Sequence, residues 1–463
     1  MRYDLLIIGM GSAGMVAAEF ASRLGVKVAV AERDRPGGDC LWTGCVPSKA
    51  LLASARAAHT IRHADGYGLE AVGPSADSER VWARIKAIQA QIAATDDNPE
   101  RFAAMGVDVL AGAARLTSPT TVRVGEQHTT RYVLLATGSR PALPAIDGLA
   151  EAVPLTSESI FALHGAPRSV VMIGGGPICV ELAQGLVRLG VRVTILQRGS
   201  RLLPREEPDL AQRLAAILRR ERVEIVTEVE ADRVTVAANN TKTVYAGERS
   251  WTAAEVFVGA GRTPNVDGLG LAECGVKVGA QGVEVDAALR TSVKSVYAAG
   301  DVAGRHHFTH SAGYEAARAV RNMFLPGTSR GAYLVPWCTF TDPELAHAGL
   351  TEAQARAQHG DPAVRVWSQD LAHSDRARTE SAPDGELRIV TAKGRIVGAH
   401  VLAPAAGEVI GELALAIDRG LKLADLASVV HVYPTIALAI QQIAAQASYA
   451  KAERLRWLVR SRA

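Results

Sequence analysis

Hydrophobic and polar positions along the chain follow two alternating patterns, short apolar runs and longer segments with helical spacing. An apolar run at Tyr3–Ile8 is followed by a glycine turn, a helical segment and a second apolar run at Lys27–Ala31. The same order returns later, with apolar runs at Ser169–Ile173 and Arg192–Leu196. Buried strands that alternate with helices predict a βαβ unit in each place, and the two together are a stronger indication than either alone.

The rest of the chain predicts further elements. Helical spacing continues at Pro47–Arg62 and Val81–Gln91. Alternating segments then predict a small β insertion, formed by Val107–Ala111, Thr121–Val124 and Arg131–Leu135. A run at Val293–Ala299 predicts a return to the first unit. The chain from Val335 onward is typical of a separate α+β domain, with strands at Val364–Trp367, Leu387–Thr391 and Arg395–Leu402 and helices at Gly407–Arg419 and Thr435–Tyr449.

Composition and charge limit the functions that the chain can have. Of its 463 residues, 48% are apolar and 21% charged, the profile of a globular protein with sizeable cores. The net charge of +3 is too small to indicate a nucleic-acid or membrane partner. No signal peptide or membrane anchor is evident, so a cytoplasmic location is expected. A basic C-terminal stretch is expected to be a solvated helix face, formed by Lys451, Arg454, Arg456, Arg460 and Arg462.

The first glycine turn has the spacing of a dinucleotide-binding loop. Glycines permit a tight turn and the close approach of a pyrophosphate, which the N-terminus of the following helix attracts. An acidic residue ends the next strand, where a carboxylate can bond ribose hydroxyls. The predicted binding residues are Gly9, Gly11, Ser12, Ala13, Gly14, Glu32 and Arg33.

The second glycine turn has Cys179 in place of the third glycine, which packing of a small residue explains. The strand after this turn ends in Gln197 and Arg198 and not in a carboxylate. With Arg201 nearby, a 2′-phosphate is the better guest, so NADPH is favoured over NADH, although NADH stays possible. The alternative is that both arginines simply face solvent. The predicted binding residues are Gly174, Gly176, Pro177, Ile178, Gln197 and Arg198.

A third feature is a cysteine pair, Cys40 and Cys45, among only five cysteines in the chain. Pro47 suits a first helical turn, which puts Cys45 at a helix N-terminus, where the dipole favours the thiolate. Lys49 follows one turn later on the same face. A structural disulfide is not favoured in a reducing compartment. Zinc is not favoured either, because no second Cys/His pair has ligand spacing, and no metal site is predicted.

These residues resemble the class I pyridine nucleotide–disulfide oxidoreductases, a family that includes dihydrolipoamide dehydrogenase, glutathione reductase and mercuric reductase. The likeness extends over essentially the whole chain, and its core motifs are most similar to mercuric reductase. The matching segments, in order, are Gly37–Lys49, Ala136–Gly138, Gly259–Asn265, Tyr297–Asp301 and Phe340–Glu344.

The resemblance implies an α/β fold with two Rossmann-like domains, one for FAD and one for NAD(P), and a C-terminal α+β dimerisation domain. The expected domains are residues 1–148 and 265–334 for FAD, 149–264 for NAD(P) and 335–463 for dimerisation. It implies a homodimer. Further cofactor-binding residues would be Gly38, Asp39, Lys49, Ala113, Thr137, Gly138, Gly261, Arg262 and Asp301.

The resemblance also assigns catalytic roles. Cys45, nearer the flavin, would be the charge-transfer thiol, and Cys40 the interchange thiol that meets the substrate. Lys49 would pair with Glu181 beside the flavin. From its own sequence context, Glu181 is only a carboxylate in the first turns of a helix, a favourable place for any acid.

The chain departs from the family near its C-terminus. Disulfide reductases carry a His-Pro-Thr-x-x-Glu motif there, supplied by the partner subunit, whose histidine is the acid–base group. Tyr433 stands in the place of that histidine and Leu438 in the place of the glutamate. An ordinary tyrosine titrates near pH ~10, so it is a poor acid for a leaving thiolate. His431 could compensate, or could be a bystander.

Mercuric reductases resemble this chain in having tyrosine in that region. They also bear a C-terminal cysteine pair, whereas the last cysteine here is Cys338, and a metal-binding module ahead of the first strand is not expected. High mercuric reductase activity is therefore not expected to be the main role.

The favoured hypothesis is an NADPH:acceptor oxidoreductase that passes electrons through FAD and the Cys40–Cys45 disulfide to a quinone, a metal ion, a reactive oxidant or an unusual thiol conjugate. Three alternatives stay open. The first is direct reduction of quinones by the flavin, with the cysteines as bystanders. The second is dihydrolipoamide dehydrogenase-like disulfide reduction that uses His431. The third is a non-catalytic redox sensor.

Overall fold

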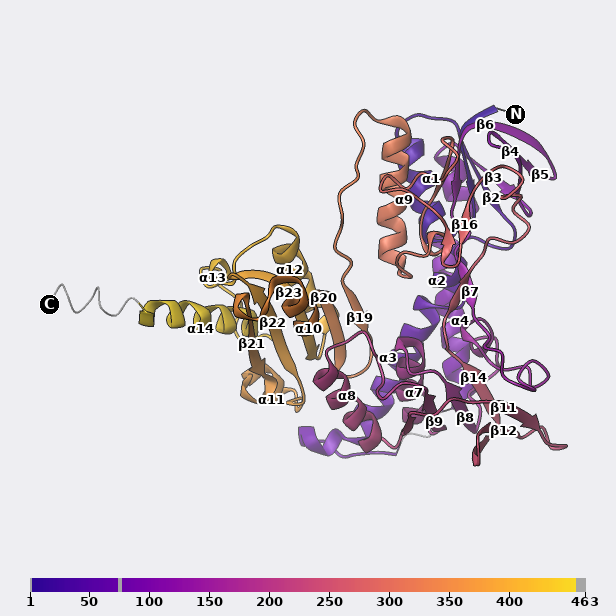
Figure 1. The fold of residues 1–463 in the computed structure, drawn as a ribbon. Helices are drawn as coiled ribbons and strands as arrows, with labels where there is room; N and C mark the ends of the chain where they lie inside the picture. The colour runs from indigo at the N-terminus through magenta and orange to yellow at the C-terminus, as the bar shows by residue number, and fades with distance from the viewer. Residues whose placement is uncertain (1, 74–76, 455–463) are drawn as a thin grey trace, which may run out of the picture. The chain divides into compact units, whose positions relative to one another are not determined.

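The computed structural model describes residues 2–73 and 77–454, which form two compact units (Figure 1). Of the described residues, the first unit contains 2–51, 77–166 and 257–332. The second contains 52–73, 167–256 and 333–454. Each unit is therefore built from three separate segments of the chain, which alternate with those of the other unit.

The first unit is organised around a seven-stranded sheet with the order β3-β2-β1-β6-β5-β4, and β18 also pairs with β6. Strands β3, β2, β1, β6 and β18 run parallel, while β5 and β4 extend the sheet in antiparallel fashion. The strands are β1 (Arg2–Ile8), β2 (Val28–Glu32), β3 (Val107–Ala111), β4 (Arg115–Ser118), β5 (Thr121–Val124), β6 (Glu126–Leu135) and β18 (Val296–Ala298).

This sheet corrects one expectation and confirms another. The segments expected to form a small β insertion all belong to the main sheet, because β3 pairs with β2, β6 pairs with β1 and β5 pairs with β6. Periodicity alone gives no partner for a short strand, which is why the sequence did not reveal this pairing. The expected return of the chain to the first unit is confirmed by β18, which lies parallel to β6.

Small residues let two helices pack closely in the first unit. Helix α1 (Ser12–Arg23) lies beside α9 (Thr309–Phe324) (Figure 1). Buried alanines of both helices belong to one hydrophobic core. The other elements there are α2 (Gly38–Trp42), α3 (Cys45–Arg62, which continues into the second unit), α4 (Ser78–Thr95), α5 (Pro99–Ala104), β7 (Ser139–Pro141), α6 (Ser157–Ile160), β15 (Arg262–Pro264), β16 (Val278–Gly279) and β17 (Gly282–Val283).

The second unit contains the other predicted βαβ element. Strands β8 (Ser169–Ile173), β9 (Arg192–Gln197) and β10 (Glu224–Thr227) are parallel, and α7 (Pro177–Arg188) connects the first two. Strand β14 (Glu255–Val258) completes the order β10-β9-β8-β14. The remaining elements of this part are α8 (Pro208–Arg220) and a three-stranded antiparallel sheet of β11 (Arg233–Val236), β12 (Lys242–Ala246) and β13 (Arg249–Ala253).

The C-terminal part of the second unit is an antiparallel sheet with the order β19-β20-β23-β22-β21. Apolar residues of this sheet form one core with α12 and α14, as the α+β prediction requires. The elements are β19 (Trp337–Thr339), β20 (Glu344–Gly349), α10 (Glu352–His359), β21 (Val364–Asp370), α11 (Asp375–Thr379), β22 (Glu386–Ala392), β23 (Arg395–Ala403), α12 (Ala406–Asp418), α13 (Leu423–Leu426) and α14 (Leu438–Arg454).

No helix among residues 2–73 and 77–454 is long and apolar enough to cross a membrane. Of the basic C-terminal residues, Lys451 and Arg454 belong to α14, whereas Arg456, Arg460 and Arg462 lie outside the described residues.

Candidate active site

Two positions of the first glycine loop admit no side chain. Gly9 has a φ of +102°, and a Cβ there would lie 2.4 Å from the carbonyl oxygen of Ala136. A Cβ at Gly14 would lie 1.9 Å from the carbonyl oxygen of Gly9. The first turn of α1 therefore packs directly against the loop that precedes it.

The same loop has the features that a diphosphate requires. Helix α1 has no side-chain cap at its N-terminus, so its first N–H groups remain available to an anion. Gly11 faces Gly38, and a Cβ on Gly38 would lie 2.9 Å from the Cα of Gly11. Glu32 is fixed at the end of β2, because its carboxylate accepts hydrogen bonds from the N–H groups of Met10 (2.7 Å) and Asp34 (2.9 Å). These residues fit the expected FAD.

The second loop repeats this arrangement with one change. The Gln197 side chain accepts a hydrogen bond from the Gly175 N–H at 3.0 Å, and both this pair and Met10–Glu32 are 22 residues apart. A neutral amide therefore occupies the place of the Glu32 carboxylate. Helix α7 begins at Pro177 and also has no side-chain cap. These features fit a second dinucleotide.

The two arginines near this loop differ in their surroundings. Arg198 is exposed and forms an ion pair with the exposed Glu230 at 3.2 Å. Arg201 donates to the carbonyl oxygens of Pro204 and Glu206, so its guanidinium supports the local backbone. Arg198 is therefore the better candidate to meet a nucleotide.

The cysteine pair lies where two short elements meet. Cys40 is on α2, and Cys45 is the first residue of α3, as the sequence predicted. The Cys45 Sγ lies 3.4 Å from the Oγ1 of Thr309, the first residue of α9. Thr309 is 264 residues away in the chain, and no short-range pattern in the sequence points to it.

These neighbours favour the thiolate of Cys45. Its pKa is lowered to about 6, first because of the hydrogen bond with Cys40 and then because of the Thr309 hydroxyl and the Lys49 ammonium. The pKa of Cys40 is raised well above its usual value by the same hydrogen bond and by burial. The pair therefore holds one proton on Cys40 and a negative charge on Cys45 near neutral pH.

The loop between the two cysteines is held by side chains from outside it. The buried Gln89 of α4 donates to the carbonyl oxygens of Leu41 (2.9 Å) and Trp42 (2.8 Å). The Trp42 indole donates to the carbonyl oxygen of Pro36, and the Arg35 guanidinium lies 3.9 Å from the centroid of its ring. These contacts restrict the positions that the cysteine backbone can take.

The two predicted crossing segments meet in the first unit. Strands β7 and β15 pair in antiparallel fashion, and the side chains of Thr137 and Asn265 each donate to a backbone carbonyl of the other residue. Gly138 and Gly261, which both have positive φ, directly precede these two strands. Of the remaining predicted residues, Arg33 and Ala113 are exposed. The structure gives neither of these two a specific role.

Asp301 is bound to residues of both crossing segments. The Ser139 hydroxyl donates to the Asp301 carboxylate at 2.5 Å, and the Arg262 Nε donates to the Ser139 hydroxyl at 2.6 Å. Ser139 was not predicted, since a serine after a glycine turn carries no distinctive signal. These residues tie Asp301, a predicted cofactor-binding residue, to both crossing segments.

Lys49 and Glu181 lie in different units. Glu181 is 6% exposed on α7, and its carboxylate accepts a hydrogen bond from the Phe340 N–H at 3.0 Å. Lys49 lies one turn after Cys45 on α3. Their pairing stays a prediction.

The residues near the C-terminal end have their own partners. The His431 imidazole bonds the Glu412 carboxylate through Nε2, at 3.1 Å, and the Val429 carbonyl through Nδ1, also at 3.1 Å. The Tyr433 hydroxyl donates to Asp375 at 3.0 Å, and the tyrosine is 67% exposed. Leu438 opens α14. Glu412 was not predicted, because it lies 19 residues before its partner.

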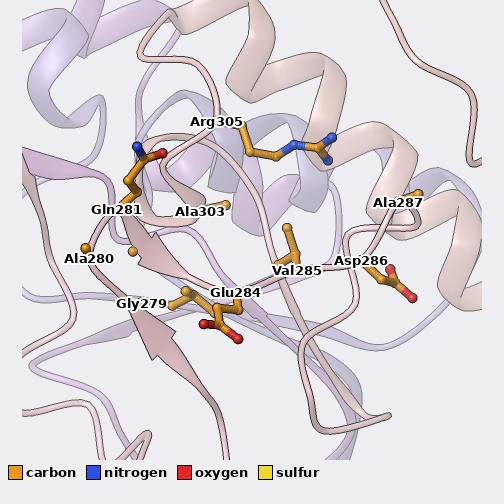
Figure 2. Close-up of a pocket in the computed structure, with 11 residues that line it drawn as sticks. Gly279, Ala280, Gln281, Glu284, Val285, Asp286, Ala287, Ala303 and Arg305 are labelled. Carbon is orange, nitrogen blue, oxygen red and sulfur yellow. The ribbon is translucent and has the colours of Figure 1, made fainter.

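The first unit also has a hollow of about 420 Å³, and none of the predicted site residues lines it (Figure 2). Its wall is formed mainly by Gly279–Ala287, with Ala303 and Arg305. Its side chains carry both acidic and basic groups, and they indicate no particular class of ligand.

The sequence comparisons agree with this architecture. A family model described as pyridine nucleotide-disulphide oxidoreductase matches residues 3–316, and the model of its dimerisation domain matches residues 335–444. The chain belongs to this family of FAD-dependent oxidoreductases, whose members use FAD and a nicotinamide nucleotide.

Curated relatives carry two different names. A dihydrolipoyl dehydrogenase of Bacillus subtilis (strain 168) is 31% identical, covering 96% of this chain and 97% of the relative. A mercuric reductase of Streptomyces lividans is 35% identical and covers 96% of each chain. Among solved structures, the HOCl-induced flavoprotein disulfide reductase RclA from Escherichia coli has a TM-score of 0.85 and 27% identity, over 96% of this chain and 99% of that one. A Cu(II) complex of RclA has a TM-score of 0.86 and 26% identity, with the same coverage.

The Thr309 hydroxyl gives a first prediction. Thr309→Val keeps the shape of the side chain but removes its hydrogen bond to Cys45, so the pKa of Cys45 should rise by roughly half to one unit. The pH dependence of iodoacetamide alkylation of the reduced protein measures this pKa. Thr309→Ser keeps the hydroxyl and should stay close to the original value. Equal profiles for the valine and serine variants would contradict the assignment.

Proposed function

We propose that this chain is an NADPH:acceptor oxidoreductase in which the Cys40–Cys45 pair carries electrons to an acceptor that is not a simple disulfide. The observation that supports this most is the position of Cys45 at the N-terminus of α3, with its thiolate stabilised by Cys40 and Thr309. Bound FAD supplies the two-electron chemistry that connects a reduced nicotinamide with a disulfide. The residues of the chain hold the thiolate, the proton and the substrate in place.

The position of the single proton in the pair favours Cys40 as the thiol that reacts with the acceptor. Cys40 holds its proton, whereas Cys45 is a thiolate near neutral pH. Lys49, one turn further along α3, favours that negative charge. Glu181, which is buried, would orient the Lys49 ammonium if the predicted pair forms.

The hydrogen bonds of His431 and Tyr433 argue against either residue as the acid that protonates a leaving thiolate. Both ring nitrogens of His431 already bond acceptors of its own chain, Glu412 and Val429. The hydrogen bond to Asp375 raises the pKa of Tyr433 further above its usual value. Tyr433 would therefore hold its proton even more tightly than an ordinary tyrosine does. This favours an acceptor whose reduction needs no proton donor.

A thiol-binding metal ion meets this requirement. Oxidation of the reduced pair, the Cys40 thiol and the Cys45 thiolate, forms the S–S bond and releases two electrons and one proton. Two Cu(II) ions would each take one electron to become Cu(I), or one Hg(II) would take both, while the proton passes to solvent. The names of the relatives support this class, because they include mercuric reductases and a Cu(II) complex of RclA.

The nucleotide preference follows from the end of β9. Gln197 is neutral where Glu32 is charged, so it does not repel a 2′-phosphate, and the exposed Arg198 can exchange Glu230 for that phosphate. NADPH is therefore the proposed electron donor, with NADH as the weaker one.

The assembly that we propose is a homodimer in the cytoplasm. The matched dimerisation domain supports a dimer. The segment around the C-terminal candidates supports it as well, since Val430 and Val432 are 89% and 75% exposed in the single chain. A second copy would remove this apolar surface from water.

Replacement of either cysteine tests the relay. Cys40→Ser and Cys45→Ser should lower NADPH-dependent turnover of Cu(II) or Hg(II) by more than roughly 100-fold, because no dithiol remains. Cys338→Ser serves as the control. Disulfides, quinones and hypohalous oxidants are assayed in parallel with both nucleotides. Full quinone turnover in the serine variants, without metal turnover in the parent, would favour direct flavin chemistry. No turnover with any acceptor would favour a sensor.

Arg198→Ala tests the nucleotide preference. Loss of one charged hydrogen-bonding partner should lower kcat/KM for NADPH by roughly 10- to 100-fold and leave that for NADH nearly unchanged. Arg192→Ala, an exposed arginine at the other end of β9, is the matched control. The preference for NADPH is wrong if Arg198→Ala weakens both nucleotides equally.

A further inference from the structure

The residue before the first redox cysteine has an unusual pair of contacts. Asp39 lies on α2, and one of its carboxylate oxygens accepts a hydrogen bond from the Thr43 hydroxyl. The other oxygen accepts from the Arg262 Nη2 at 2.8 Å. The Asp39 backbone carbonyl also accepts from the Thr43 N–H at 2.9 Å. Asp39 thus holds Thr43, which lies between Cys40 and Cys45.

The partner of Asp39 is itself held rigidly. The Arg262 side chain is 13% exposed and donates to the hydroxyl (2.6 Å) and to the carbonyl oxygen (3.0 Å) of Ser139. Its Nε lies 3.5 Å from a carboxylate oxygen of Asp301. One guanidinium therefore lies between two carboxylates, one beside the redox cysteines and one in the predicted flavin motif. All four side chains belong to the first unit.

The charge of Asp39 acts against the chemistry next to it. A carboxylate close to Cys45 disfavours a thiolate, and Asp39 raises the pKa of Cys45 while Lys49 lowers it. Arg262 compensates that negative charge without leaving its hydrogen bonds to Ser139. Removal of Arg262 alone would leave the full charge of Asp39 beside the pair.

We propose that Asp39 and Arg262 are positioning residues, which anchor the redox loop to the Asp301 motif and set how strongly Cys45 is held as a thiolate. This inference rests on the proposed relay and adds a tuning mechanism to it. Asp39 supplies the geometry, at the expense of thiolate stability, and Arg262 restores that stability. The two residues should therefore act in opposite directions on one measured quantity.

The test is a double-mutant cycle on the holoenzyme with D39N, R262Q and D39N/R262Q. Two readouts are followed against pH, the flavin–thiolate charge-transfer absorbance of the two-electron-reduced enzyme, and iodoacetamide labelling of Cys45 located by mass spectrometry. D39N should move both midpoints to lower pH and R262Q to higher pH, in each case changing the ratio of thiolate to thiol at a given pH by roughly two- to ten-fold. In the double variant the effect of R262Q should largely vanish.

The control variant is D34N, and it is measured by the same two pH titrations. D34N removes a nearby exposed carboxylate that pairs only weakly, with Arg35 at 4.0 Å, and should move neither midpoint. Additive shifts, or shifts in the same direction for D39N and R262Q, would overturn the proposal. If R262Q is not recovered folded, the comparison of D39N with D34N decides alone. Failure of the relay itself would appear differently, as no charge-transfer absorbance in the unmodified FAD-loaded enzyme.

Discussion

The proposed chemistry of this protein depends on one arrangement, the thiol of Cys45 at the N-terminus of α3 with Cys40 and Thr309 beside it. Three elements must be in place before it exists: α2, which carries Cys40, α3, which begins at Cys45, and α9, which begins at Thr309. The close packing of α1 on α9 through alanines fixes the last of these. Loosening of that helix pair would therefore weaken the thiolate as well as the fold.

The binding features and the redox features rely on different physical means. The dinucleotide loops use backbone geometry, because Gly9 and Gly14 admit no side chain and both helices lack side-chain caps. The cysteine pair relies on charge and hydrogen bonding, with Lys49 favouring the thiolate and Asp39 opposing it. The repeated 22-residue link, from Met10 to Glu32 and from Gly175 to Gln197, ends on a carboxylate in the first loop and on a neutral amide in the second.

Local pattern was enough to predict much of the fold and the cysteine pair. Strand β8 and the start of α3 follow from apolar runs, glycines and the proline at position 47. Contacts distant in sequence could not be predicted in the same way. Thr309 lies 264 residues from Cys45, and Ser139 joins Arg262 to Asp301 across two crossings. The pairing of β3 with β2 and of β6 with β1 was missed for the same reason. A two-residue period shows that a segment is a strand but not which strand lies beside it.

The central claim is that electrons from the nicotinamide reach the Cys40–Cys45 disulfide and leave a thiolate at Cys45. Anaerobic titration of the FAD-loaded protein with NADPH, followed by absorbance, tests it most directly. The account predicts a two-electron-reduced form with a flavin–thiolate charge-transfer band at pH values above about 6, where Cys45 is ionised. Full bleaching of the flavin without that band would contradict the relay.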